Sequence, residues 1–274
     1  MKKIAYYHLY LTDDNSWIYL FIDQMASMID YGLWDELDEF NVTAIGKSET
    51  FIHMKELLGY YKNLSKKDLK ISFTDLYKNI DDGQLISLDY FRNSDIYTET
   101  DTLKVIHERC EKSIESFNVL YFHGKGVTAL DRPLRYGNYP TIINTIHWRK
   151  YMDWCCLEKW EECNNLMVYW DTVGTNSCQW PSPHYSGNYW WATSEYISSL
   201  KSPVDKEWWE NYKAKYPNIN RLPDRIVAEM WIGSGENIKM YSMHNPPYPP
   251  PQSNLGERFI NRRDYIRKSE GGFW

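Results

Sequence analysis

Two segments of the sequence combine the residue types that chemistry on a small ligand requires, and the first covers residues 119–128. It is an apolar run that ends in His123, Gly124, Lys125 and Gly126. Glycines on both sides of a lysine let an ammonium group and backbone N–H groups come close to a phosphate. We therefore predict that His123, Lys125 and Gly126 bind a phosphate group. For His123, metal ligation and packing at the end of a strand are the alternatives.

The second segment covers residues 184–192 and reads HYSGNYWWA. Aromatic faces suit the C–H faces of a sugar ring, and short polar side chains suit its hydroxyls. This interpretation assigns sugar or acceptor binding to five residues: His184, Ser186, Gly187, Asn188 and Trp190. Consecutive residues of a strand face opposite sides, so we expect one of the two adjacent tryptophans in the core and the other at the site.

Composition limits the class of protein. The 274 residues are enough for one large domain with a substantial core. Aromatic residues make up 16% of the chain; this share suits carbohydrate handling, although core filling explains most of them. A net charge of −6 without a basic block excludes a nucleic-acid partner held by phosphate contacts.

The hydrophobic stretches and the cysteines of the sequence indicate where the protein is located and the state of its thiols. No stretch approaches the roughly 20 apolar residues of a membrane span, and the amino terminus lacks the apolar region of a signal peptide. We therefore expect a soluble, cytoplasmic protein without a membrane span. The five cysteines form no CxxC pair, which favours reduced thiols over a zinc site.

Strands alternate with helices in the first half of the chain, which predicts an α/β fold around a mostly parallel sheet. The expected strands are residues 3–10, 40–46, 69–73 and 119–123, and the expected helices are 17–31, 51–61 and 102–116. In the second half we expect helices at 145–163, 194–216 and 223–232 and a strand at 166–170. The proline-rich residues 246–251 predict an extended surface strap, followed by a charged tail helix at 256–268.

Ligands of such a fold bind beyond the carboxyl ends of the strands. The first strand ends near His8 and Tyr10, and the fourth ends at His123 and Lys125. If both strands are central and parallel, these side chains form a nucleotide pocket, in which Tyr10 stacks on the base and His8 reaches the ribose or a phosphate. For His8 and Tyr10, packing in the core or at its rim is the alternative.

Five short motifs follow one another in the sequence between residues 121 and 233. They are YFHGKGVT at 121–128, HWR at 147–149, DTVG at 171–174, HYSGNYWWA at 184–192 and RIVAEMWIG at 225–233. Together they resemble a family of GT-A-like glycosyltransferase domains found in bacteria and in large algal (chlorella-type) viruses, where these enzymes help to build surface or capsid glycans. The resemblance covers about residues 1–245.

The resemblance implies a single GT-A-like domain with a Rossmann-like central sheet. Residues 1–130 would bind a nucleotide-sugar donor, a UDP- or GDP-sugar, and residues 131–245 would bind the glycan acceptor, with the strap and tail at 246–274 outside the match. For a viral protein, the implied location is the host cytoplasm.

Glycosyl transfer needs charge stabilisation on the leaving diphosphate and, in an inverting enzyme, a carboxylate base. Lys125, His123 and Arg149 fit the first role. Glu229 and Asp171 are the candidates for the second, and a structural pair with Arg225 is the alternative for Glu229. A retaining enzyme would not need such a base.

One departure from the family concerns the metal. Typical GT-A enzymes end the fourth strand in Asp-x-Asp, which holds Mn²⁺ or Mg²⁺ against the diphosphate. This chain has His123, Gly124 and Lys125 there, and a lysine can carry part of the metal's charge. Metal dependence therefore stays open. Asp81, Asp82 and Asp95 are further acidic candidates, but none clearly follows a buried strand, and we place Asp81 and Asp82 in a solvated turn.

Two other classes of function compete with the glycosyltransferase. A non-catalytic carbohydrate-binding module would explain the aromatic excess but does not require the Lys125 turn. A methyltransferase-like nucleotide enzyme would need a glycine-rich turn after the first strand, and residues 8–12 contain no glycine. The sequence leaves the oligomeric state open.

Overall fold

A computed structural model describes residues 1–12, 14–46, 48–75, 99–127, 139–221 and 224–243. The expected strap and tail helix and the acidic candidates Asp81, Asp82 and Asp95 lie outside these residues.

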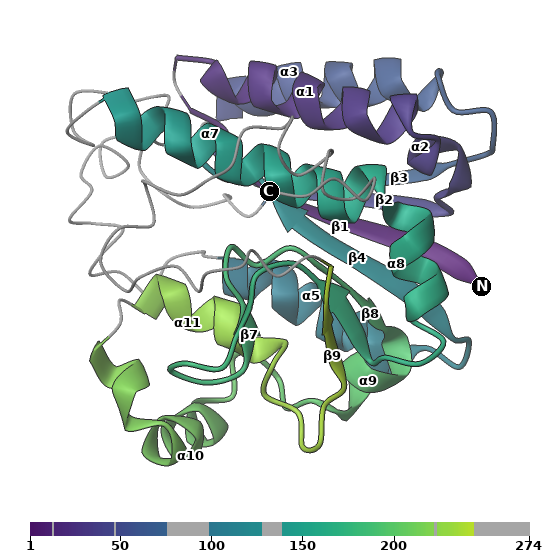
Figure 1. The fold of residues 1–274 in the computed structure, drawn as a ribbon. Coiled ribbons are helices and arrows are strands. Elements are labelled where there is room, and N and C mark those ends of the chain that lie inside the picture. Colours follow the sequence, from purple (N-terminus) through teal and green to yellow (C-terminus); the bar gives the residue numbers. More distant parts are fainter. Residues whose placement is uncertain (13, 47, 76–98, 128–138, 222–223, 244–274) are drawn as a thin grey trace, which may run out of the picture.

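The centre of the fold is a seven-stranded sheet with the order β3-β2-β1-β4-β8-β5-β9 (Figure 1). Its strands are β1 (Lys2–Tyr10), β2 (Glu39–Ile45), β3 (Lys70–Asp75), β4 (Phe117–His123), β5 (Thr172–Gly174), β8 (Trp190–Thr193) and β9 (Met240–Ser242). The first four are mutually parallel, whereas β8 runs antiparallel to its neighbours β4 and β5. The predicted α/β class with a mostly parallel sheet is confirmed.

Helices cover both faces of this sheet. Figure 1 shows α1 (Ser16–Asp30), α3 (Ser48–Lys62) and α7 (Tyr139–Asp153) on one side, and α5 (Glu99–Lys112), α9 (Ser194–Ser199) and α11 (Asp224–Trp231) on the other. The remaining helical segments are α2 (Leu33–Glu36), the π-helical turn η2 (Trp154–Glu158), α8 (Trp160–Leu166), α10 (Lys206–Lys215) and the 3-10 turn η3 (Pro217–Arg221). A small hairpin of β6 (Ser177–Cys178) and β7 (His184–Tyr185) completes the described part of the fold.

Strand β1 explains why the sequence folds around a central sheet. Ala5, Tyr7 and Leu9 belong to the core under α1 and α7, whereas Ile4 and Tyr6 belong to the core under α5 and α9. A strand buried on both faces reads as an uninterrupted apolar run. Each large apolar side chain that is removed from water in this way contributes about 1.5–3 kcal/mol.

The two adjacent tryptophans of β8 also divide between the two cores. Trp190 packs against Tyr121 and Trp231, while Trp191 donates from Nε1 to the carbonyl of Cys156 in η2 at 2.9 Å. Both indoles are 0% exposed. The expectation that one of them faces a sugar, with Trp190 as the candidate, is therefore wrong, because helices cover both faces of β8.

Three expected elements in the second half are corrected. Residues 166–170 form the end of α8 and a turn instead of a strand, and Val168 and Tyr169 are exposed. The expected helix 145–163 continues through η2 into α8, and residues 194–216 are two helices separated by Pro203, which interrupts helical hydrogen bonding. Apolar content alone does not separate a short strand from a helix end.

Candidate functional site

The candidate site lies where β1 and β4 end side by side. The strand order 3-2-1-4 means that the chain builds outward on one side of β1 and then returns to the other side. Ligands of open α/β sheets bind outside the carboxyl ends of the strands at such a switch point. His8 and His123 are register partners there, and Gly124 N–H donates to the His8 carbonyl at 2.9 Å. The prediction that these two strand ends meet is thereby confirmed.

Both histidines are buried and electrically neutral near pH 7. His8 Nδ1 lies 2.8 Å from Thr102 Oγ1, and burial lowers the pKa of His8 to about 4. Burial, together with the neighbouring ammonium of Lys125, lowers the pKa of His123 to about 3. The Nε2 of His123 lies 2.8 Å from the Gly187 carbonyl oxygen. Neither imidazole carries positive charge near pH 7, so of the residues predicted to bind phosphate at this edge, Lys125 is the cation.

Lys125 occupies the turn after β4 and is held from two sides. Its Nζ lies 4.4 Å from the centre of the Trp148 ring and 3.7 Å from Oε1 of Glu229. The turn requires glycine at position 126, where φ is +87° and a Cβ would come within 2.8 Å of Thr145 Cγ2. Lys125 and Glu229 are thus brought together from opposite halves of the chain.

Gly187 lies between His123 and Glu229. Its φ is +94°, and a Cβ at this position would come within 2.4 Å of Met152 Sδ. Its carbonyl accepts from His123, and its N–H donates to Oε2 of Glu229 at 3.1 Å. Gly187, expected to approach a sugar, therefore makes its polar contacts with protein groups of the site.

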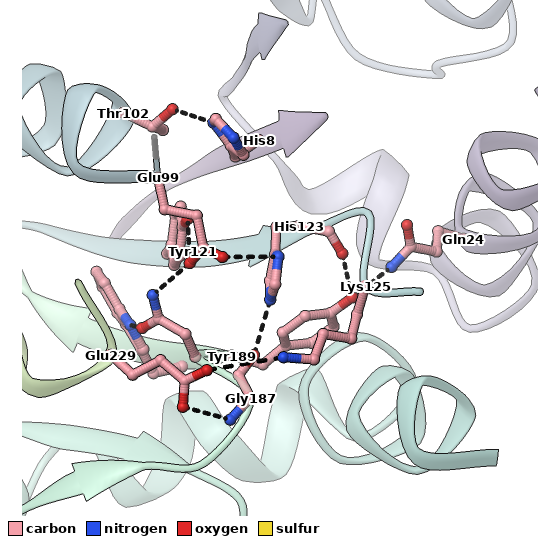
Figure 2. A network of polar contacts seen from close by, with 12 residues as sticks. His8, Gln24, Glu99, Thr102, Tyr121, His123, Lys125, Gly187, Tyr189 and Glu229 are labelled. Atoms are coloured by element: carbon pink, nitrogen blue, oxygen red, sulfur yellow. Dashed lines mark hydrogen bonds and ion pairs between the residues drawn. The ribbon is translucent and has the colours of Figure 1, made fainter. Parts of the chain in front are cut away.

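Glu99 is a site residue that the sequence analysis missed. It opens α5, and its Oε2 accepts from Asn188 Nδ2 at 2.8 Å and from Tyr121 Oη at 3.2 Å (Figure 2). Its Oε1 lies 3.3 Å from His123 Nδ1. The expected helix began at residue 102, so this carboxylate was left outside it. Acidic residues in the first turn of the helix that leads into β4 were the available signal.

Arg149, expected to bind the diphosphate, lies elsewhere. Its Nη1 donates to Asp23 at 2.8 Å and to Asp153 at 3.3 Å, and the residue is 5% exposed. Burial raises the pKa of Asp153 to about 6, against the opposing effect of Arg149. The guanidinium thus compensates two carboxylates of α1 and α7, and the structure gives it a structural role in place of the expected one.

Asp171, the second candidate base, lies at the opposite edge of the sheet. Its Oδ2 accepts from the N–H of Lys239 at 2.8 Å, and its carbonyl accepts from Thr193. Thr193 pairs with Asn118 at the start of β4, whereas the site lies at the end of β4. The expectation for Asp171 is therefore wrong, because β5 presents its amino end at this position.

The other expected sugar and nucleotide residues are held by protein contacts. His184 Nδ1 lies 2.7 Å from the Ser182 carbonyl, and the N–H of Ser186 donates to the carbonyl of Asn176 at 3.0 Å. Asn188 is fully buried and bridges Glu99 to the indole N–H of Trp190. Tyr10 is partly buried against the core.

The side chains that the structure describes at this site do not form a cluster that could hold a divalent metal ion. Over the described ranges, no group of three or more His, Cys, Asp and Glu side chains is arranged to hold one. Both ring nitrogens of His123 already face oxygen atoms of Glu99 and Gly187.

The helices of the described residues are too short or too polar for any of them to span a membrane.

The chain is similar to one protein family and to solved structures. A family model described as "Domain of unknown function (DUF8361)" matches residues 6–247. Among solved structures, 4-diphosphocytidyl-2C-methyl-D-erythritol synthase from Anaerococcus prevotii DSM 20548 is similar with 11% sequence identity and a TM-score of 0.37. That match covers 96% of this chain and 95% of the other. No curated protein matches the sequence.

Proposed function

The chain belongs to the family described as a domain of unknown function (DUF8361), and we propose that it is a glycosyltransferase. It moves a sugar from a UDP- or GDP-sugar to a glycan acceptor, and the resemblance noted above suggests surface or capsid glycan synthesis. The observation that carries the proposal is the pairing of Lys125 with Glu229, at 3.7 Å, beyond the β1/β4 switch point. This places a cation and a carboxylate where α/β sheets bind ligands.

Lys125 acts on the leaving group. When the bond between the sugar's anomeric carbon and the diphosphate oxygen breaks, negative charge grows on the diphosphate. An ammonium group fixed by the Trp148 ring, 4.4 Å away, is already directed to this edge of the sheet.

Glu229 acts on the acceptor. Gly187 N–H binds its Oε2 at 3.1 Å and leaves Oε1 facing Lys125. The acceptor hydroxyl forms the new bond to the anomeric carbon, and its proton goes to the Glu229 carboxylate. A separation of 3.7 Å has no room for a sugar ring, so the Lys125–Glu229 pair must open when the donor binds. The diphosphate then replaces Glu229 as the partner of Lys125.

A thermal-shift experiment tests nucleotide binding. The purified protein is melted alone and with UDP, GDP and their sugar conjugates, each with and without Mn²⁺. A ligand at 100 times its Kd stabilises the folded state by about 2.7 kcal/mol. We expect one nucleotide class to raise the Tm of the wild type and to have a much smaller effect on Lys125→Met. Lys104→Met, on the exposed side of α5, is the matched control and retains the full shift.

The same samples separate the two classes of function. Release of nucleoside diphosphate from the stabilising donor, dependent on an oligosaccharide acceptor, supports the transferase. Stabilisation by free oligosaccharides but by no nucleotide overturns it and leaves a non-catalytic carbohydrate-binding module.

A further inference from the structure

Glu99 makes polar contacts with three residues around the end of β4: Asn188, Tyr121 and His123. We propose that Glu99 is a positioning residue: it fixes the ring of His123 and the Gly187–Asn188 turn, and through them the carboxylate of Glu229. This inference rests on the proposed role of Glu229 as the base. Figure 2 shows the chain of contacts from Glu99 through His123 and Gly187 to Glu229.

The two ring nitrogens of His123 contact Gly187 and Glu99. The Gly187 carbonyl oxygen, 2.8 Å from Nε2, can only accept, so Nε2 carries a hydrogen. Oε2 of Glu99 already accepts from Asn188 and Tyr121. Oε1 of Glu99 lies 3.3 Å from the other ring nitrogen of His123, Nδ1. Glu99 and Gly187 thus contact opposite nitrogens of the His123 ring, and the two contacts together fix its orientation.

Glu99 also holds the turn formed by Gly187 and Asn188. Glu99 binds the Asn188 side chain directly and binds Gly187 through His123, so two consecutive residues are tied to one carboxyl group. Asn188 has a φ of 54° and Gly187 a φ of +94°, both in the left-handed region. Backbone in this region persists when surrounding contacts over-determine it. Asn188 is also tied to Trp190, whose indole N–H donates to Asn188 Oδ1 at 2.9 Å.

The Gly187 peptide orients the carboxylate of the proposed base, Glu229. A fixed Gly187 peptide directs its N–H at Oε2 of Glu229, 3.1 Å away. The remaining oxygen, Oε1, then faces Lys125 at 3.7 Å. If Glu99 loses its contacts, Gly187 is free to rotate and Glu229 loses its orienting donor. Lys125 is held on the diphosphate side by the Trp148 ring, 4.4 Å from its Nζ, and this contact should persist without Glu99.

Nuclear magnetic resonance tests the positioning without any enzymatic assay. In protein with ¹⁵N-labelled histidine, we expect His123 to carry its hydrogen on Nε2 from pH 5 to 9. In Glu99→Leu, the ring signals should show loss of this fixed state, and the Gly187 amide should exchange with solvent at least about tenfold faster. Unchanged ring signals and unchanged Gly187 exchange in Glu99→Leu would overturn the inference.

Kinetics supply the second readout. Misplacement of a catalytic group by about 1 Å costs about 10²-fold in rate. We therefore expect Glu99→Leu to lower kcat about 100-fold and to change the KM for the donor less than about threefold. Glu99→Gln should restore most of the rate, because its amide can donate to His123 Nδ1 while its oxygen accepts from Asn188 and Tyr121.

The controls keep the two proposals separate. Glu108→Leu, on the same helix in exposed ion pairs with Lys104 and Lys112, should change neither readout. Glu99→Asp, which withdraws the carboxyl by one methylene, serves the same test if Glu99→Leu does not fold. Equal loss of kcat in Glu99→Gln and Glu99→Leu would overturn the positioning role. A wild-type protein without transferase activity would refute the proposed function, and the magnetic resonance result would still decide the role of Glu99.

Discussion

The ammonium of Lys125 lies 3.7 Å from the carboxylate of Glu229, although one follows β4 and the other belongs to α11. The sheet brings Lys125 and Glu229 into contact, because β8 pairs with β4 and places the Gly187 turn at the end of β4. Glu229 is then bound by the Gly187 N–H. The first half of the chain thus supplies the cation of the site and the second half supplies its carboxylate.

Replacement of Glu229 by glutamine tests the proposed base. The amide oxygen of Gln can still accept from Gly187, so the fold should persist, whereas an amide cannot take a proton from the acceptor. We expect kcat to fall about 10²- to 10⁴-fold, with the nucleotide-induced rise in Tm retained. Steady-state kinetics and thermal melting measure the two effects. Glu210→Gln, exposed on α10, is the control, and a Glu229→Gln enzyme with wild-type kcat would contradict the assignment.

Replacement of Arg149 by methionine tests its structural role. The change leaves Asp23 and Asp153 without their guanidinium, and Asp153 is fully buried. Removal of one partner of a buried ion pair costs about 3–5 kcal/mol, measurable by urea unfolding. The double variant Arg149→Met/Asp153→Asn should recover part of that loss. Arg109→Met, which removes a more exposed pair with Glu39, should cost about 1 kcal/mol or less.

Arg149 also separates two interpretations of the site. Since its guanidinium lies in the α1/α7 ion cluster, the variant should keep its nucleotide-induced rise in Tm, provided that it folds. Loss of that rise in a folded Arg149→Met protein would return Arg149 to the diphosphate site.

The parts of the fold that could be predicted depend on local signals. The apolar runs of β1 and β4 and the glycines around Lys125 identified the sheet and the edge at which the candidate site lies. Parallel strands then place His8 beside His123 by geometry alone. These inferences required only the sequence near each strand.

The parts that could not be predicted depend on contacts between distant segments. Whether Trp190 faces a ligand depends on Trp231, and whether Arg149 faces one depends on Asp23. Asp171 was misplaced because the direction of β5 in the sheet is set by its pairing with β8. Glu99 was missed because the importance of a helix-opening carboxylate appears only when Asn188 and His123 lie beside it.

The buried His8 predicts a pH dependence of stability. Its pKa is lowered to about 4 in the folded protein by burial, whereas an unfolded histidine has a pKa of about 6.5. Between these values the unfolded state binds more protons, so stability falls as the pH drops from 6.5 towards 4. At about 1.4 kcal/mol per pKa unit, the change from about 6.5 to about 4 corresponds to a total loss of about 3–4 kcal/mol once the pH is below 4.

Urea unfolding at pH 7 and pH 5 measures this effect. His8→Asn, whose amide can replace the contact of Nδ1 with Thr102, should reduce the difference between the two pH values. His123 contributes with the same sign, so part of the dependence should remain. His53→Asn, exposed on α3, should leave the difference unchanged; an equal reduction in both variants would refute the assignment to His8.

The turn at Gly187 makes the sharpest prediction about stability. Alanine at this position would have to adopt a φ of +94° and would bring its Cβ within 2.4 Å of Met152 Sδ and 3.0 Å of Trp148 Cζ2. Left-handed backbone alone costs an alanine about 1–2 kcal/mol, so we expect Gly187→Ala to lose at least about that amount of unfolding free energy. Gly59→Ala is the matched control: its Cβ meets nothing within 4 Å inside α3, and helix propensity should stabilise the protein by up to about 1 kcal/mol. Urea unfolding measures both changes, and opposite signs distinguish a required glycine from a replaceable one. A Gly187→Ala protein as stable as the wild type would show that the turn does not constrain the site.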